Sequence, residues 1–358
     1  MSHPLEHLRP EIRALSPYTI SHTEARIKLD ANENPFGPSE KIRREIREVL
    51  DRIAVNRYPD PAATELKAVI AKFLRIPADR LLLGNGSDEL IGYLITTFAG
   101  KGNGVLYPAP TFSMYGIIAA AFGQKRIEVP LDAHFKIDPD RLTSTIHEAS
   151  PEIIFLASPN NPTGREFPEE VILSLLEESG AVVVLDEAYI DFSGHAGSLP
   201  LLDRYPNLII LRTLSKIGMA SLRLGILTAA PEILREIEKV RLPYNVNTFS
   251  QAAATVLLGH EESLRTQIET IVSERARLFS ALSQIPQITP IPSTANFILF
   301  RTDEADRLFN SLLNAGILIR NLNIPGPLAG SLRVTIGTPE ENHEFICHLQ
   351  NFFQGEKS

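Results

Sequence analysis

Between residues 81 and 228 the sequence alternates short, continuous apolar runs with longer stretches of helical periodicity. The apolar runs cover residues 81–83, 105–107, 153–157, 182–185, 208–211 and 224–228, with helix-like stretches such as 87–99 and 168–178 between them. Strands that are apolar on both faces belong to parallel sheets, because helices cover each side of such a sheet. The pattern therefore predicts an α/β domain with a mainly parallel sheet between helices.

The segments that flank this region predict a second, smaller unit. Residues 1–30 form an arm without strong periodicity, and residues 30–38 are rich in Asn, Pro and Gly, which indicates a turn. Helices are expected over 40–51 and 62–73, and later over 250–282, 305–315 and 341–353, with strands at 298–300, 317–319 and 332–335. We expect a large domain over 31–247 and a smaller α+β domain over 248–358.

Composition excludes several classes of protein. With 358 residues and 44% hydrophobic side chains, the chain can bury roughly three quarters of its unfolded surface, enough for a deep site. A net charge of −8 without a basic stripe argues against nucleic acid as a partner. The single cysteine, Cys347, allows neither an internal disulfide nor a thiolate metal cluster, so no metal is expected and a reducing cytoplasm fits best. The sequence contains neither a signal-peptide pattern nor a run of 18 apolar residues, so secretion and membrane spanning are not expected.

Lys216 follows the apolar run 208–211 and precedes a stretch rich in Gly, Ala and Ser. A lysine there could bind an aldehyde cofactor, provided that burial or neighbouring groups lower its pKa so that the amine can lose its proton. Taken alone, a loop lysine is more often a solvated surface cation. The functional interpretation depends on the residues that accompany it.

Three of these residues also follow strands, where ligands collect in parallel sheets. Asp186 follows the run 182–185 and could keep a pyridinium nitrogen protonated, although Asp in this position also commonly caps a turn or helix. Tyr189 and Asn161 could donate hydrogen bonds to a phenolic oxygen and so favour its anionic form. Asn161 also begins an Asn-Pro-Thr-Gly sequence that is typical of a plain turn.

A phosphate site is predicted where residues 84–89 lead into the helix that starts near Ser87. The backbone N–H groups of a helix start bind phosphate, and a nearby cation and hydroxyls complete such a site. The candidates are Gly86, Ser87, Asp88, Thr213, Ser215 and Arg223. The sequence is neither a P-loop nor a dinucleotide fingerprint, and a simple capping box remains the alternative.

Three further side chains are candidates for ring and carboxylate contacts. Phe112 could stack on a cofactor ring, although an aromatic residue there is more often part of the core. Arg320 and Arg333 lie at short apolar strands of the smaller domain, and a guanidinium group is the natural bidentate partner of a carboxylate or phosphate. A surface salt bridge is the alternative for each arginine.

The ordered motifs of the whole chain resemble those of the fold-type-I aminotransferases, and within them the histidinol-phosphate aminotransferases. Each motif is short, but their order is specific. The motifs are Leu-Asp-Ala-Asn-Glu-Asn-Pro (29–35), Asn-Arg-Tyr-Pro (56–59), Gly-Ser-Asp-Glu (86–89), Ser-Pro-Asn-Asn-Pro-Thr-Gly (158–164), Asp-Glu-Ala-Tyr (186–189), Thr-Leu-Ser-Lys (213–216), Pro-Tyr-Asn-Val-Asn (243–247) and Leu-Arg-Val-Thr-Ile-Gly (332–337).

The resemblance implies pyridoxal 5'-phosphate as the cofactor and a role for each candidate. Lys216 would bind the cofactor aldehyde covalently, Asp186 would pair with the ring nitrogen, and Asn161 and Tyr189 would hold the phenolic oxygen. Gly86, Ser87, Asp88, Thr213, Ser215 and Arg223 would surround or support the phosphate, and Phe112 would stack on the ring.

The resemblance also implies a homodimer with shared active sites. Tyr58 would reach the cofactor phosphate of the neighbouring subunit, and the arm, residues 1–30, would contribute to the small domain and the dimer. Arg333 would bind the substrate carboxylate or its equivalent, while Arg320 and Tyr18 would meet the distal phosphate of histidinol phosphate. The residues expected in the walls of the substrate site are Asn34, Tyr244 and Asn247.

The implied reaction is transamination between L-histidinol phosphate and 2-oxoglutarate, giving imidazole acetol phosphate and L-glutamate. An aromatic aminotransferase and a threonine-phosphate decarboxylase are the alternatives on the same fold. A third alternative, a regulator that senses the cofactor, would need a DNA-binding module, for which the arm has no room.

This sequence departs from many relatives at three points. Arg223 comes seven residues after Lys216 instead of eight, Phe112 replaces a tyrosine, and Ile226 stands where tyrosine is common.

Overall fold

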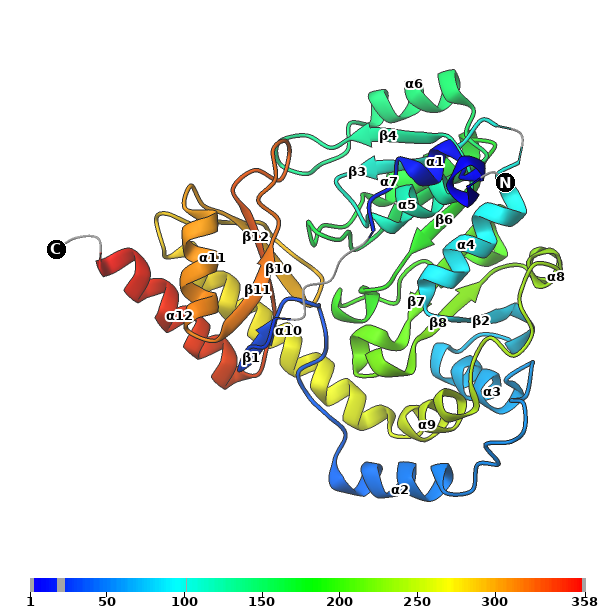
Figure 1. The fold of residues 1–358 in the computed structure, drawn as a ribbon, viewed down its shortest axis with the longest axis horizontal. Helices are drawn as coiled ribbons and strands as arrows, with labels where there is room; N and C mark the ends of the chain where they lie inside the picture. The colour runs from blue at the N-terminus through cyan, green and yellow to red at the C-terminus, as the bar shows by residue number, and fades with distance from the viewer. Residues whose placement is uncertain (1–2, 18–22, 101, 356–358) are drawn as a thin grey trace.

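The computed structural model describes residues 3–17, 23–100 and 102–355, which form two sheets with helices around them (Figure 1). The larger sheet has seven strands in the order β2-β8-β7-β6-β5-β3-β4. Its strands are β2 (Leu81–Asn85), β3 (Val105–Ala109), β4 (Arg126–Pro130), β5 (Ile153–Ala157), β6 (Val182–Asp186), β7 (Leu208–Thr213) and β8 (Leu224–Thr228). β8 alone runs opposite to the other six strands, so the predicted mainly parallel sheet is confirmed.

Helices cover both faces of this sheet because successive side chains of each strand point to opposite sides. On β5, Ile154 and Leu156 pack with helices α6 (Pro139–Ala149) and α7 (Glu169–Glu178). Phe155, on the other face, packs with α4 (Ser87–Phe98), α5 (Met114–Ala121) and α8 (Pro231–Glu238). The continuous apolar runs of the sequence are therefore strands that are buried on both faces.

The smaller sheet has the order β1-β11-β12-β10-β9. Its strands are β1 (Ile27–Leu29), β9 (Thr289–Pro290), β10 (Phe297–Arg301), β11 (Ile317–Asn321) and β12 (Ser331–Thr335). The helices α10 (Glu261–Ser283), α11 (Ala305–Asn314) and α12 (Pro339–Gln354) pack with it. Helix α10 also contacts a short 3-10 turn of the larger unit, η3 (Ile190–Phe192), so it lies against both units (Figure 1).

The remaining helices are α1 (Pro10–Arg13), α2 (Glu40–Leu50), α3 (Thr64–Leu74) and α9 (Thr248–Leu258), and the other 3-10 turns are η1 (Pro4–His7), η2 (Ala78–Arg80), η4 (Leu199–Asp203), η5 (Leu214–Ile217) and η6 (Ala220–Leu222). The arm divides between the two units, because β1 pairs with β11 whereas α1 lies against α5, where the Arg9 guanidinium donates to the Ala121 carbonyl. Within the described residues, no helix is long and apolar enough to cross a membrane.

Two elements differ from the sequence prediction. Strand β4 was not predicted, because exposed Arg126 and Glu128 alternate with buried Ile127 and Val129 at the edge of the sheet. The long helical region expected over 250–282 is present as two helices, α9 and α10, which Gly259 and His260 separate.

Candidate active site

The carboxyl ends of the central strands bring the predicted residues to one edge of the larger sheet. Asp186, the last residue of β6, lies opposite Ala157 of β5 and Leu211 of β7 in the strand register. Lys216 follows β7 directly, in the turn η5, and Asn161 follows β5. Because parallel strands end at the same edge, side chains separated by 55 residues in the sequence share one site.

Lys216 is held in place by the hydrogen bonds of its own turn. Thr213 caps η5, with its hydroxyl oxygen accepting from the Ser215 N–H at 3.1 Å, and Gly218 ends the turn with a φ of 103°. Such a φ favours glycine, which has no Cβ to clash. The half-buried Lys216 side chain places its Nζ 5.7 Å from the centre of the Tyr189 ring.

Asp186 is a buried carboxylate, only 4% exposed. Its Oδ2 accepts a hydrogen bond from the Tyr115 hydroxyl at 2.6 Å, and its Oδ1 accepts from the Ala188 N–H at 3.1 Å. Burial raises the pKa of Asp186 to about 6, although both hydrogen bonds oppose the rise. A cation next to this carboxylate would compensate the cost of burying its charge.

Tyr115 is a site residue that the sequence analysis missed. It is fully buried, stacks on Phe155 at 4.8 Å between ring centres, and donates its proton to Asp186. Burial and the Asp186 carboxylate raise the pKa of Tyr115 well above its usual value, so it stays a donor. The sequence does contain an indication of this role, because Tyr115 is the one hydroxyl-bearing residue of the otherwise apolar helix α5. A buried tyrosine needs a hydrogen-bond partner for its hydroxyl.

Asn161 and Tyr189 are each held by a residue outside the larger sheet. The Arg333 guanidinium donates to Asn161 Oδ1 at 2.6 Å, and the Asn32 Nδ2 donates to the Tyr189 hydroxyl oxygen at 3.0 Å. Since Oδ1 of Asn161 accepts from Arg333, its Nδ2 is the group left to donate into the site. Arg333 also donates to the Asp30 carbonyl at 2.7 Å, so its predicted role in carboxylate binding would be shared with a structural one.

The start of helix α4 forms a cup that could hold a phosphate group. Gly86 precedes the helix with a φ of 84°, and Ser87 is its first residue, so the first backbone N–H groups lack partners within the helix. A Cβ at Gly225 would lie 2.5 Å from the Gly86 carbonyl carbon, so only glycine lets β8 approach so closely. Arg223 reaches this cup in spite of the short spacing from Lys216, with its Nη2 3.3 Å from Asp88 Oδ2.

Two hydroxyls and one ring complete the surroundings of the site. The hydroxyls of Thr213 and Ser215 lie 2.9 Å apart, and Thr213 donates to the Leu224 carbonyl at 3.1 Å. Phe112 is half-buried and meets Tyr115 edge to face at 5.6 Å between ring centres. These contacts link the end of β7 to β8, and the loop after β3 to the Asp186 carboxylate.

The predicted substrate residues are more widely distributed. Arg320 of β11 lies opposite Arg333 of β12 in the strand register. Asn34 donates from its side-chain amide to Gln267 of α10 at 2.9 Å, which fixes the loop after β1 on that helix. Asn247 caps α9 by accepting from the Ser250 N–H at 2.9 Å. Tyr18 lies outside the described residues.

Tyr58 and Tyr244 lie on the surface and stack on each other, with 4.6 Å between ring centres. Their segments, 52–61 and 241–249, are adjacent, because Arg241 donates to the Pro61 carbonyl at 3.2 Å. The exposed apolar side chains of these segments, which we call the tyrosine patch, are Val55 (78% exposed), Tyr58 (81%), Leu242 (65%), Tyr244 (42%) and Phe249 (46%).

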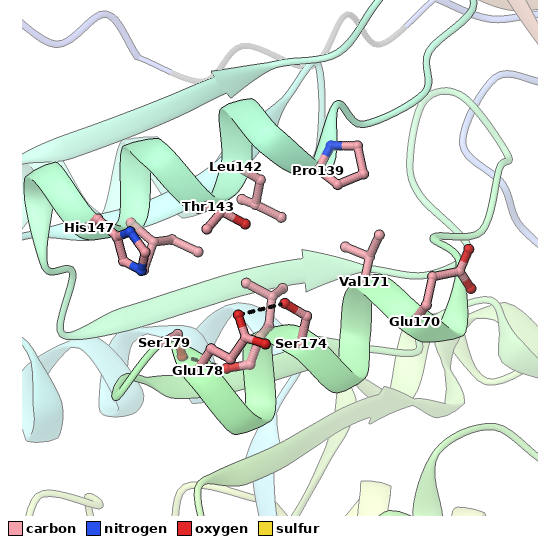
Figure 2. A pocket seen from close by; sticks show the side chains of 11 residues that line it. Pro139, Leu142, Thr143, His147, Glu170, Val171, Ser174, Glu178 and Ser179 are labelled. Atoms are coloured by element: carbon pink, nitrogen blue, oxygen red, sulfur yellow. Dashed lines mark hydrogen bonds between the residues drawn. The ribbon is translucent and has the colours of Figure 1, made fainter.

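A hollow of the described chain lies away from this site. It has a volume of about 100 Å³ and lies between α6 and α7, with Leu142 and Val171 among the residues that line it (Figure 2). None of the predicted site residues contributes to it. Within the described residues, no cluster of three or more His, Cys, Asp or Glu side chains could hold a metal ion.

The chain is similar to known proteins over most of its length. The model of the family "Aminotransferase class I and II" matches residues 24–349. The chain is similar to histidinol-phosphate aminotransferase 2 of Nitrosococcus oceani (44% identity, 96% of each chain) and to histidinol-phosphate aminotransferase of Aquifex aeolicus (42% identity, 95% of this chain and 96% of the relative).

Solved structures extend the likeness to the fold. The histidinol-phosphate aminotransferase from Clostridium acetobutylicum has a TM-score of 0.82 at 27% identity, covering 92% of this chain and 99% of its own. L-threonine-O-3-phosphate decarboxylase from Porphyromonas gingivalis has a TM-score of 0.78 at 22% identity, covering 92% and 99%, so the fold alone does not select the reaction. The family match spans nearly the whole chain, including every predicted site residue except Tyr18, and this chain belongs to the class I and II aminotransferase family.

Proposed function

We propose that this protein is a pyridoxal-phosphate-dependent enzyme that transfers the amino group between L-histidinol phosphate and 2-oxoglutarate. The observation that carries the proposal is the meeting of Lys216, Asp186, Asn161 and Tyr189 at one edge of the sheet. The names of the relatives at 42% and 44% identity support the choice of substrate.

The residues of the site fit the cofactor. The buried Asp186 carboxylate would pair with the protonated ring nitrogen, which would compensate its buried charge. The cup at Gly86 and Ser87, together with Arg223, would bind the phosphate. When bound, the cofactor supplies an electron sink for the substrate's alpha carbon. Nδ2 of Asn161 and the hydroxyl of Tyr189 would donate to its phenolic oxygen.

Lys216 would move the proton of the reaction. Its Nζ would hold the cofactor aldehyde and, when free, would be the base that takes the proton from the substrate's alpha carbon and the acid that returns it. A group does this best when its pKa lies near the working pH. The Tyr189 ring, 5.7 Å from Nζ at its centre, and the surrounding turn would restrict the position of the amine.

Two arginines would receive the anionic groups of the two substrates. Histidinol phosphate carries a phosphate, whereas glutamate carries two carboxylates, so one site must bind different anions in turn. Arg320 and Arg333 are neighbours across β11 and β12, and guanidinium groups bind both phosphate and carboxylate through paired hydrogen bonds. We assign the distal phosphate to Arg320, because Arg333 is already engaged with Asn161.

We further propose a homodimer in which each subunit completes the other's site. The tyrosine patch is an exposed apolar surface of the kind that marks protein interfaces. If Tyr58 acts in the neighbouring site, Tyr58→Ala and Lys216→Ala protomers should complement each other. Mixing and refolding the two inactive variants should restore about a quarter of wild-type activity, since half of the dimers would carry one intact site. No recovery would argue against shared sites.

The substrate assignment is tested by comparing histidinol phosphate, histidinol, phenylalanine and phosphothreonine side by side. We expect histidinol phosphate to react fastest, and loss of its phosphate to lower kcat/KM about ten- to a hundredfold, as for one charge-assisted contact. Arg320→Gln should remove most of this preference while leaving kcat/KM for histidinol nearly unchanged. Faster reaction with phenylalanine, or release of carbon dioxide from phosphothreonine, would refute the assignment.

A further inference from the structure

Asn32 is a buried residue that was not among the predicted site residues and has no role in the proposed reaction. It lies in the loop after β1, is 1% exposed, and has a φ of 55° in the left-handed region. Asparagine tolerates this conformation better than most residues. Its side chain crosses from the smaller unit to the larger one, because its Nδ2 donates to the Tyr189 hydroxyl oxygen at 3.0 Å.

The surroundings of Asn32 decide which end of its amide faces Tyr189. The Thr335 hydroxyl accepts from the Asn32 backbone N–H at 2.9 Å and donates to the Asn32 Oδ1 at 3.3 Å. The Asn32 carbonyl in turn accepts from the Asn296 side chain at 3.0 Å. With Oδ1 receiving the Thr335 proton, Nδ2 is the end that points to Tyr189.

This orientation controls the proton of the Tyr189 hydroxyl. Because the oxygen accepts from Asn32, its own proton does not go to Asn32, and within the described residues no other acceptor for that proton is recorded. The proton is therefore left to donate into the site. A hydroxyl that accepts one hydrogen bond also becomes a stronger donor of the next, since hydrogen bonds in a chain polarise each other.

We infer that Asn32 is a positioning residue, which directs the Tyr189 proton toward the phenolic oxygen of the cofactor and so stabilises the anionic form of that oxygen. The inference rests on the cofactor assignment proposed above. It predicts that the pH at which the visible absorption band of the bound cofactor titrates depends on a residue that does not touch the cofactor.

Apart from the carboxylate that Asn32→Asp introduces, the charged and titratable groups around Tyr189 stay the same in the Asn32 variants. Lys216 Nζ lies over its ring, Tyr115 and Asp186 lie on the side of the larger sheet, and Arg333 lies over Phe297, which meets Tyr189 edge to face. A shift in the titration therefore reports the substitution at Asn32.

The experiment is a pH titration of the visible band of the purified holoenzyme. In Asn32→Gly, which keeps the left-handed backbone, we expect the midpoint to rise by about half to one pH unit, as for one lost hydrogen bond. In Asn32→Asp, which has nearly the same shape, the carboxylate would accept the Tyr189 proton and draw it away from the site. The rise should then be larger than in Asn32→Gly.

Two comparisons separate positioning from a merely structural role. In a Tyr189→Phe background the shift caused by Asn32→Gly should disappear, because the two residues act through one hydrogen bond. A structural role predicts instead that Asn32→Gly does not shift the band, or that its shift persists without the Tyr189 hydroxyl. Either of these results, or an Asn32→Asp variant that titrates like the wild type, overturns the inference.

The same titration distinguishes this inference from the proposed function. A wild-type protein that develops no visible band with added pyridoxal phosphate would refute the cofactor assignment, and the inference with it. A band whose midpoint is unchanged in either Asn32 variant would refute the inference alone. If Asn32→Gly does not fold, Asn32→Asp retains the size of the side chain, and the part of its shift that disappears in the Tyr189→Phe background gives the decisive comparison.

Discussion

Replacing Asp186 by asparagine should make the cofactor-free protein more stable at alkaline pH. Burial raises the pKa of this carboxyl from 3.8 to about 6. Because the folded state holds the proton more tightly than the unfolded state does, this contribution to stability is complete below pH 3.8 and is lost as the pH rises through 6. The shift of about two units corresponds to about 3 kcal/mol of unfavourable charge burial at pH 8.

The asparagine cannot keep both hydrogen bonds of the carboxylate. If its Oδ1 accepts from the Ala188 N–H, its Nδ2 must face the Tyr115 hydroxyl, which then loses its acceptor. We set this loss at about 1 kcal/mol, which leaves a net gain of about 2 kcal/mol for Asp186→Asn at pH 8. Between pH 5 and pH 8 the gain should grow by about 1.5 kcal/mol, whatever the cost of the lost hydrogen bond.

The assay is urea unfolding of cofactor-free wild type and Asp186→Asn at pH 5, 6, 7 and 8, with free energies from linear extrapolation. Asp51→Asn, at an exposed position at the end of α2, is the matched control for the same substitution without burial. A difference between Asp186→Asn and the wild type that does not change with pH would refute charge burial as its cause. Added pyridoxal phosphate should stabilise Asp186→Asn less than the wild type, because the ring nitrogen has lost its partner.

Three further substitutions test other parts of the structure. Lys216→Ala should abolish the visible band of the bound cofactor and lower transamination about 10²- to 10⁴-fold, measured in a spectrophotometric assay. Gly225→Ala should lower the free energy of unfolding by about 1–3 kcal/mol and weaken cofactor binding in a fluorescence titration, because its Cβ would lie 2.5–2.6 Å from the backbone at the start of α4. Gly100→Ala, with open space around it, is the control and should leave both unchanged. Glu187→Ala should cost about 3–5 kcal/mol in urea unfolding, because it leaves the buried Arg212, now 2.7 Å from the Glu187 carboxylate, without its ion pair.

The sequence predicted the larger sheet and the positions of Lys216 and Asp186 because both depend on local patterns. A continuous apolar run identifies a buried strand, and the residue that follows it must lie at the carboxyl edge of the sheet. Most predicted helices agree with the structure within one or two residues, as for α7 and α11. Strand β4 was not predicted because it lies at the edge of the sheet, where exposed polar residues alternate with buried apolar ones.

The missed site residues depend on contacts between distant parts of the chain. Tyr115 is 71 positions from Asp186, and Asn32 is 157 positions from Tyr189. No periodicity connects such pairs, and only the packing of the two sheets brings Asn32 to the Tyr189 hydroxyl. The roles predicted for Tyr58, Arg320 and the substrate walls stay predictions, since they depend on a second subunit and on bound substrate.

Strand β12 connects the smaller sheet to both donors of the proposed cofactor site. Arg333 and Thr335 are two positions apart on this strand, so their side chains lie on the same face. Arg333 donates directly to Asn161, whereas Thr335 orients Asn32, which donates to Tyr189. A displacement of the smaller sheet must therefore change the hydrogen bonds of Asn161 and Tyr189 together. Substitutions that loosen β12 should alter the titration of the bound cofactor even where they touch neither the cofactor nor Lys216.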